Sequence, residues 1–331
     1  MANIHLTMAT NDYDHVRDIT MGIVRPDGID LTVLTMEVEE IFHRFLFSLE
    51  WDISELSMGM STSWISRGGA PFVLIPVFPS RVFRFSSIYV PTDGKVKRPA
   101  DLRGKRIGVP EWGQTAGIYT RGWLVHQAGV RLQDVTWVQS GINDPGRQEA
   151  AKLDLPPGVK LEVVTDRSLT QMMLDGDLDA AFSARVPNEV LRGNPKLTRM
   201  FPNFREEEEK FCRETGIFPI MHAVAIKKSV VDQHPWVPMN MFKAFDEARR
   251  RGVARLTDVT ASQIAVPWLV EDVARLRKLI FGSHEYWAYG IEPNRVTLDA
   301  FLQYGHEQGV FHRRLKPEDL FPESVQHFFK K

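Results

Sequence analysis

The sequence predicts an α/β protein of two lobes with a ligand cleft between them. Short apolar segments with the period of strands alternate with segments of helical period, which is typical of sheets covered by helices. Crossing segments interrupt this alternation twice, and 331 residues are enough to bury a core in each of two domains. We therefore expect lobe one to comprise residues 1–92 and 225–331, and lobe two to comprise residues 93–224.

The composition excludes several classes of protein. The chain has 41 basic and 42 acidic side chains, so no basic excess is present to bind nucleic acid or an anionic membrane. Its one cysteine, Cys212, excludes an internal disulfide and a thiolate metal site. We expect a small-molecule ligand, and neither a nucleic acid nor a membrane as partner. Amphipathic C-terminal helices allow a homo-oligomer, but the sequence does not decide the oligomeric state.

The N-terminal segment bears on the compartment. Residues 1–10 alternate between polar and apolar side chains like a first strand, and they lack the basic start, apolar stretch and cleavage site of a secretory leader. The chain contains no run of about 18 apolar residues that could span a membrane. The sequence therefore predicts a cytoplasmic protein.

The loop after the first strand contributes candidates for the cleft. This strand is expected over residues 4–9, and ligands of open α/β sheets bind beyond the carboxyl ends of the strands. Asn11, Tyr13 and His15 follow that end, so they either line the cleft or belong to a solvated loop. The second strand is expected over residues 29–34 and a helix over 37–49. The acidic residues at the start of this helix include Glu37 and Glu39. They are better explained by the positive N-terminus of the helix than by a catalytic role.

The third and fourth strands, expected over residues 52–58 and 72–78, also end in polar residues. After the third strand, the hydroxyl of Ser61 either caps the next helix or binds an anion. After the fourth come Arg81 and Arg84, and a guanidinium binds a carboxylate through two parallel hydrogen bonds. We expect Arg81 to bind a carboxylate and Arg84 to form a surface ion pair.

Residues 101–124 form the most informative stretch. An apolar strand over residues 107–109 is broken by Pro110, and Thr115 can cap the helix that follows the loop 111–114. A buried strand that leads through a short loop into a helix N-terminus favours an anion there. There is no GxGxxG, GKS or GKT motif, so the sequence indicates a small anion rather than a dinucleotide or a nucleoside triphosphate.

The remainder of lobe two adds an arginine and a histidine. Arg185 ends a strand in the same lobe as Thr115, so the two are expected to converge on one carboxylate. His222 lies in an apolar strand expected over residues 217–226, where a histidine is either a hydrogen-bonded core residue or a catalyst. The chain from residue 230 on is predicted to be mostly helical, over 238–251, 258–264, 270–281 and 295–308.

Several separated motifs carry a resemblance to a known family. The motifs are PVFPSRVFR (76–84), Thr115-Ala116 with Arg121-Gly122, Asp144-Pro-Gly-Arg147 and GIFPIMH (216–222). With these motifs the chain as a whole resembles the 4,5-dihydroxyphthalate decarboxylase family, and the stretch 101–124 resembles the second lobe of type II periplasmic binding proteins. The resemblance implies the two-lobed type II periplasmic-binding-protein-like fold, used inside the cell. One departure is Phe85, where that family is expected to have a histidine.

The resemblance implies non-oxidative decarboxylation of a hydroxylated aromatic acid, with 4,5-dihydroxyphthalate as the expected substrate and protocatechuate as the product. In that reaction Arg81 and Arg185 would position a carboxylate. His222 or His15 would protonate the ring, and Glu111 would act as the base at the hydroxyl edge. We expect no organic cofactor, and the sequence does not decide whether a divalent metal ion is bound. The rival interpretation is a non-catalytic solute-binding protein of an ABC importer for a small carboxylate, on the same fold.

Overall fold

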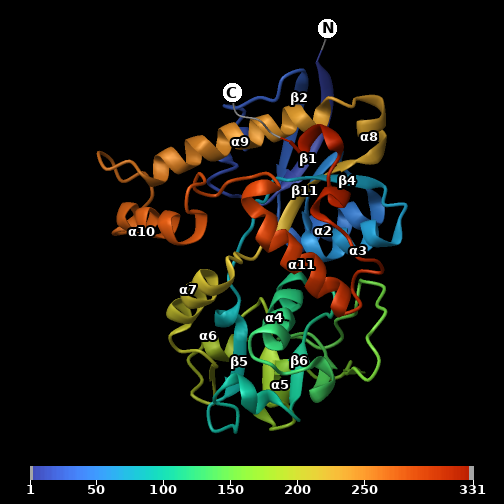
Figure 1. Ribbon diagram of the computed structural model, residues 1–331, viewed down its shortest axis with the longest axis vertical. Helices are drawn as coiled ribbons and strands as arrows, with labels where there is room; N and C mark the ends of the chain where they lie inside the picture. The colour runs from blue at the N-terminus through green and yellow to red at the C-terminus, as the bar shows by residue number, and fades with distance from the viewer. Residues whose placement is uncertain (1–2, 328–331) are drawn as a thin grey trace.

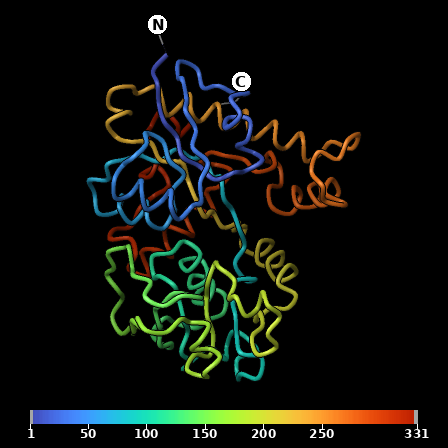
Figure 2. The backbone as a smooth tube through the Cα atoms, turned by 180° about the vertical axis from the view of Figure 1, so that it is seen from behind, coloured from blue at the N-terminus to red at the C-terminus, as the bar shows by residue number. Residues whose placement is uncertain are grey.

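The computed structural model describes residues 3–327 and shows two lobes, one above the other (Figure 1). The upper lobe contains the N-terminal segment, blue in Figure 1, and the C-terminal segment, orange to red, whereas the green and yellow middle of the chain forms the lower lobe. Figure 2 shows the same division from behind. Each lobe has its own sheet, so the predicted two-lobed α/β fold is confirmed.

The sheet of the first lobe has the strand order β2-β1-β3-β11-β4. β2 and β3 run parallel to β1, and β11 runs antiparallel to its neighbours β3 and β4. All of β3 is buried, as expected for a central strand covered on both faces. The register places His222, the first residue of β11, opposite Ser57, the last residue of β3. The strands are β1 (Ile4–Thr10), β2 (Ile29–Thr35), β3 (Ile53–Ser57), β4 (Phe72–Ile75) and β11 (His222–Lys227).

The sheet of the second lobe has the order β10-β5-β9-β6-β7-β8. β6 runs parallel to β7 and β9, β7 runs parallel to β8, and β5 runs antiparallel to β9 and β10. Because β5 pairs with these strands, residues 88–91 belong to the second lobe and not to the first, where the expected boundary at residue 92 had put them. The strands are β5 (Ile88–Pro91), β6 (Arg106–Val109), β7 (Thr136–Gln139), β8 (Lys160–Val163), β9 (Ala180–Phe182) and β10 (Leu197–Arg199).

The chain crosses between the lobes at residues 76–87 and again at 216–221, and the two crossing segments pair with each other. Arg81 and Ile220 form an antiparallel bridge, and the Met221 N–H donates to the Ser80 carbonyl at 2.8 Å. A 3-10 turn, η1 (Phe85–Ser87), leads from the first crossing segment into β5. Phe85 is buried against Trp123, Phe201 and Phe211 of the second lobe.

Helices cover both sheets. α9 lies across the upper lobe in Figure 1 and buries Met241, Phe245 and Ala248 at helical spacing. The helix expected over residues 258–264 does not form, because the Asp258 carboxylate accepts hydrogen bonds from the backbone and hydroxyl of Thr260, which stabilises a turn. The helices are α1 (Arg17–Thr20), α2 (Val38–Ser48), α3 (Met58–Arg67), α4 (Thr115–His126), α5 (Leu169–Leu174), α6 (Asn188–Leu191), α7 (Phe204–Thr215), α8 (Lys228–Gln233), α9 (Val237–Leu256), α10 (Leu269–Leu276) and α11 (Arg295–Glu307).

The C-terminal part of the first lobe also packs against the second lobe. α11 packs against α4, and a Cβ atom at Gly122 of α4 would lie 2.1 Å from the Tyr304 ring, so only glycine permits this approach. The Gln308 side chain accepts from Arg121 Nε at 2.8 Å, and its carbonyl accepts from Trp112 Nε1 at 2.8 Å. These contacts fix one side of the lobe junction. Within residues 3–327, no helix combines the length and the apolar composition needed to cross a bilayer.

Candidate active site

A cleft of about 580 Å³ lies between the lobes, which suits an aromatic ring with polar substituents. Both lobes contribute to its walls, and the side chains include arginines, carboxylates, hydroxyls and the two histidines His43 and His222. Four of the residues expected from the sequence line it: Glu111, Thr115, Arg185 and His222. The lining residues that the sequence did not single out for the site include Phe42, Ser57, Met60, Arg84 and Arg147.

His222 forms a hydrogen-bonded pair with a buried carboxylate. Its Nδ1 atom lies 2.6 Å from Glu55 Oε1, and its ring meets the Phe42 ring edge-on at 4.9 Å between centroids. β11 and β3 are neighbours in the sheet, so the two strands hold both side chains in place. Because Glu55 occupies Nδ1, Nε2 is the ring nitrogen available to a ligand in the cleft.

Glu55 is a candidate functional residue that sequence reasoning missed. Its side chain is fully buried and also accepts from Tyr13 Oη at 2.6 Å and from the Asn11 N–H at 2.8 Å. Burial alone would favour the neutral acid, but hydrogen bonds from His222, Tyr13 and Asn11 outweigh it, so the pKa of Glu55 lies below its ordinary value. Burial and the neighbouring Glu55 raise the pKa of Tyr13, which therefore stays protonated. The signal in the sequence was a carboxylate inside the apolar strand 53–57.

Two helix N-termini meet where the lobes touch at the cleft. The hydroxyls of Ser57, just before α3, and Thr115, at the start of α4, are 3.0 Å apart, and the Gly59 N–H donates to Thr115 Oγ1 at 2.9 Å. A Cβ atom at Gly59 would lie 2.4 Å from the Gly113 carbonyl, so the lobes approach at glycine. Thr115 was expected to be the N-cap of α4, but Gln114 takes that position. The Thr115 hydroxyl instead forms hydrogen bonds with Ser57 and Gly59 of the other lobe. Both helix dipoles favour an anion here.

The roles expected for the two arginines of the first crossing segment are reversed. Arg81 is buried, donates to Asn294 Oδ1 at 2.7 Å and to the Phe218 carbonyl at 2.9 Å, and does not line the cleft. Arg84 lines the cleft, and its Nε atom donates to Met221 Sδ at 3.2 Å. Side chains three apart in an extended segment point to opposite sides, which explains the reversal.

Arg84 is suited to bind an anion. Within residues 3–327 no carboxylate forms an ion pair with it. Burial lowers its pKa to about 10, so the guanidinium stays charged at neutral pH. Glu208 lies close enough to act on Arg84 electrostatically but forms no ion pair with it, so the guanidinium can form charge-assisted hydrogen bonds with a ligand carboxylate.

Two further arginines from the second lobe line the cleft. Arg147 Nε donates to Glu111 Oε1 at 2.5 Å, and Glu39 of α2 lies 3.4 Å from Arg147 Nη1 and 3.0 Å from Arg185 Nη2. Arg147 belongs to the DPGR motif 144–147, but no role was predicted for it from the sequence. Glu111 accepts from Arg147 on Oε1 only, so its other carboxylate oxygen can accept a hydrogen bond from a ligand in the cleft.

Besides Arg81, four candidates from the sequence do not line the cleft. Asn11 and Tyr13 lie behind His222, where they bond to Glu55, and Asn11 Nδ2 also donates to the Met36 carbonyl. The Ser61 hydroxyl donates to the Ser57 carbonyl at 2.7 Å inside α3. His15 packs against Trp287 at 5.3 Å between ring centroids, and burial lowers its pKa to about 4, so the ring is neutral and does not supply a proton at neutral pH.

Comparison with known proteins shows the family of the chain. The chain is 36% identical over 330 residues to a 4,5-dihydroxyphthalate decarboxylase of Comamonas testosteroni, and the match covers 99% of both chains. The chain belongs to the 4,5-dihydroxyphthalate decarboxylase family. A protein of the same name from Pseudomonas putida is 37% identical over 202 residues, which is 61% of this chain and 78% of that protein. A family model described as "NMT1/THI5 like" matches residues 82–152.

Solved structures place this decarboxylase-family chain in the periplasmic-binding-protein fold. A periplasmic sulfonate-binding protein of Methylobacillus flagellatus superimposes with a TM-score of 0.56 and 15% identity, covering 98% of this chain and 93% of that protein. At such low identity the likeness shows the fold alone. The fold expected from the sequence is confirmed.

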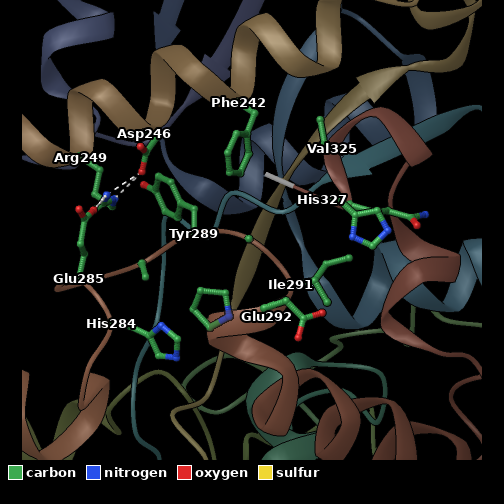
Figure 3. Close-up of a pocket in the computed structure, with 14 residues that line it drawn as sticks. Phe242, Asp246, Arg249, His284, Glu285, Tyr289, Ile291, Glu292, Val325 and His327 are labelled. Atoms are coloured by element: carbon green, nitrogen blue, oxygen red, sulfur yellow. Dashed lines mark hydrogen bonds and ion pairs between the residues drawn. The ribbon is translucent and has the colours of Figure 1, made fainter. Parts of the chain in front are cut away.

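A second cavity, of about 310 Å³, lies beside α9 in the first lobe (Figure 3). It shares no lining residue with the cleft. Figure 3 shows its arginine, Arg249, directed at Asp246 and Glu285, with ion-pair distances of 2.6 and 2.5 Å. Because two carboxylates already neutralise this guanidinium, the cavity attracts an anionic ligand less than the cleft does.

The sequence did not decide whether the protein binds a divalent metal ion. Among the residues that the structure describes, no group of three or more His, Cys, Asp or Glu side chains is arranged to hold a metal ion. Of the three carboxylates that line the cleft, Glu39 and Glu111 form ion pairs with arginines instead.

Proposed function

We propose that this protein is a carboxy-lyase that converts 4,5-dihydroxyphthalate to protocatechuate and CO2 without oxidation. The observation that carries the proposal is the match over 99% of both chains to a protein named for that activity. The cleft supports it, because it combines cations for carboxylates with a histidine held by a buried carboxylate.

The reaction needs a proton on the ring carbon before CO2 leaves. Direct loss of CO2 would place a negative charge on an aromatic carbon, which is unfavourable. In 4,5-dihydroxyphthalate each carboxylate is para to a hydroxyl, whose electrons stabilise the cation formed when that carbon is protonated. The bond between the ring and the carboxylate then breaks, its electron pair restores the aromatic ring, and CO2 departs. One proton enters for each CO2 released.

We assign the proton transfer to His222. Its Nε2 atom would donate from the imidazolium form, while Glu55 fixes the ring orientation through Nδ1 and stabilises the positive charge before transfer. Tyr13 and Asn11 keep Glu55 ionised and in position. His15, the other candidate from the sequence, is neutral and lies outside the cleft.

We assign substrate binding to the arginines and hydroxyls of the cleft. Arg84 would hold one carboxylate, and Arg185 with the N-terminus of α4 at Thr115 would serve the other end of the ligand, as the sequence predicted for that pair. Glu111 would accept the hydrogen bond of a ring hydroxyl, which increases the electron density at the para carbon. His222 and Glu111 belong to opposite lobes, so lobe closure brings the two groups to the same ring.

A panel of carboxylic acids tests the proposal. The protein should release CO2 from 4,5-dihydroxyphthalate and leave protocatechuate, whereas phthalate should bind without reacting, because it has no para hydroxyl. Binding without CO2 release across hydroxylated phthalates and benzoates would contradict the proposal and favour the solute-binding interpretation. We also propose a cytoplasmic location, and recovery of the protein in a periplasmic fraction would contradict it.

A further inference from the structure

One glutamate of the first lobe bridges two arginines of the second. Glu39 lies in the first turn of α2, with Oε2 3.0 Å from Arg185 Nη2 and Oε1 3.4 Å from Arg147 Nη1. All three residues line the cleft. A single carboxylate therefore spans the lobes and occupies cationic groups that face the ligand space.

These ion pairs are suited to exchange. The side chains of Arg185 and Glu39 are 65% and 43% exposed, and ion pairs of such exposure are weak because water competes for both partners. Arg84, in contrast, forms no ion pair with a carboxylate within residues 3–327. A ligand carboxylate need not break an ion pair at Arg84, whereas at Arg147 and Arg185 it must displace Glu39.

We propose that Glu39 is a specificity-determining residue that stands in for the second carboxylate of the substrate. The inference rests on the proposed function, since it assigns the substrate class of that site. A dicarboxylate binds Arg84 with one group and displaces Glu39 with the other. A monocarboxylate satisfies Arg84 and leaves Glu39 in place.

The same exchange favours product release. Decarboxylation replaces a carboxylate of the ligand with hydrogen, so the product has one anionic group where the substrate had two. Glu39 competes more effectively against a ligand that has lost one of its two anchors, and its return to Arg147 and Arg185 accompanies departure of the product.

Calorimetric titration with two unreactive ligands tests this role. Phthalate has two carboxylates and benzoate has one, and neither has the hydroxyl that the reaction needs. Glu39→Gln should tighten phthalate binding about 3- to 10-fold, since two weak ion pairs no longer compete, and should leave benzoate affinity unchanged. Unchanged or weaker phthalate binding, or equal tightening of both ligands, would overturn the proposal.

Glu37→Gln is the matched control. Glu37 lines the same cleft and carries the same charge, but it has no ion pair among the residues described. Removing its charge should change the ratio of phthalate to benzoate affinity less than Glu39→Gln does. An equal change would mean that any negative charge in the cleft has the same effect, and it would overturn the role proposed for Glu39. Because neither ligand reacts, the outcome is independent of CO2 release: a protein without decarboxylase activity could still show the Glu39 effect.

Discussion

Replacing Glu55 with glutamine probes the proposed proton transfer through a residue that does not touch the substrate. The substitution conserves shape but removes the negative charge behind His222. Glu55 accepts from His222 and Tyr13 on Oε1, at 2.6 Å each, and from the Asn11 N–H on Oε2 at 2.8 Å. An amide accepts at one end only, so glutamine must place its NH2 group against donors.

The expected magnitude follows from these bonds. A hydrogen bond to a charged group contributes about 1.5–3 kcal/mol, and glutamine loses the charge from all three and at least one bond outright. We expect about 2–3 kcal/mol lower stability. We also expect kcat to fall about 10²- to 10³-fold, which corresponds to about 3–4 kcal/mol of lost stabilisation of the imidazolium.

The assay is kcat for 4,5-dihydroxyphthalate across about pH 5 to 9, together with the calorimetric affinity for phthalate. The alkaline limb of the pH profile should move to lower pH in Glu55→Gln, while phthalate affinity stays within about threefold of the wild type. Tyr13→Phe is the control, since it removes one bond to Glu55 and keeps the charge, and its kcat should fall less than about tenfold. A Glu55→Gln enzyme with nearly normal kcat, or with an unmoved pH profile, would refute the reasoning.

Further predictions concern the arginines and His15. Arg84→Ala should weaken phthalate binding by about 1.5–3 kcal/mol in calorimetry and Arg84→Lys should recover part of it; unchanged affinity in Arg84→Ala would contradict the anchor role. Arg185→Ala should lower the affinity for phthalate and leave the affinity for benzoate unchanged. An equal loss of affinity for both ligands would contradict separate binding of the two carboxylates by Arg84 and Arg185. Arg81→Ala should lower the denaturation midpoint, because it breaks buried bonds to Asn294 and Phe218, and a selective loss of binding would show that it contacts ligand after all. The depressed pKa of His15, about 4, means that its contribution to stability is complete above about pH 6.5 and falls by about 2–3 kcal/mol as pH drops to 4. His15→Gln should remove that part of the pH dependence of the free energy of unfolding, measured by denaturant titration. A pH dependence equal to that of the wild type would contradict this prediction.

Local patterns in the sequence predicted the fold and part of the cleft. Strand and helix periods are local properties, and ligand sites of α/β sheets follow strand ends, which is how Thr115, Arg185 and Glu111 were found. The helix expected over residues 258–264 failed because the Asp258 carboxylate bonds to the backbone nearby and stabilises a turn instead.

The residues that the sequence missed depend on long-range pairing. Glu55 meets His222 only because β11 returns to lie beside β3, and no local pattern gives that register. Likewise, which of Arg81 and Arg84 faces the cleft depends on the bridge between Arg81 and Ile220 in the two crossing segments. Such pairings join residues more than 130 positions apart, as in the bond from Arg81 to Phe218, separated by 137 positions.

The most direct test of the central claim compares His222→Ala with the wild type on 4,5-dihydroxyphthalate. If His222 donates the proton, kcat should fall about 10²- to 10⁴-fold while the phthalate affinity measured by calorimetry stays within about threefold. CO2 release at close to the wild-type rate by His222→Ala would contradict the account, because it would leave the proton transfer to another group and make His222 a core residue.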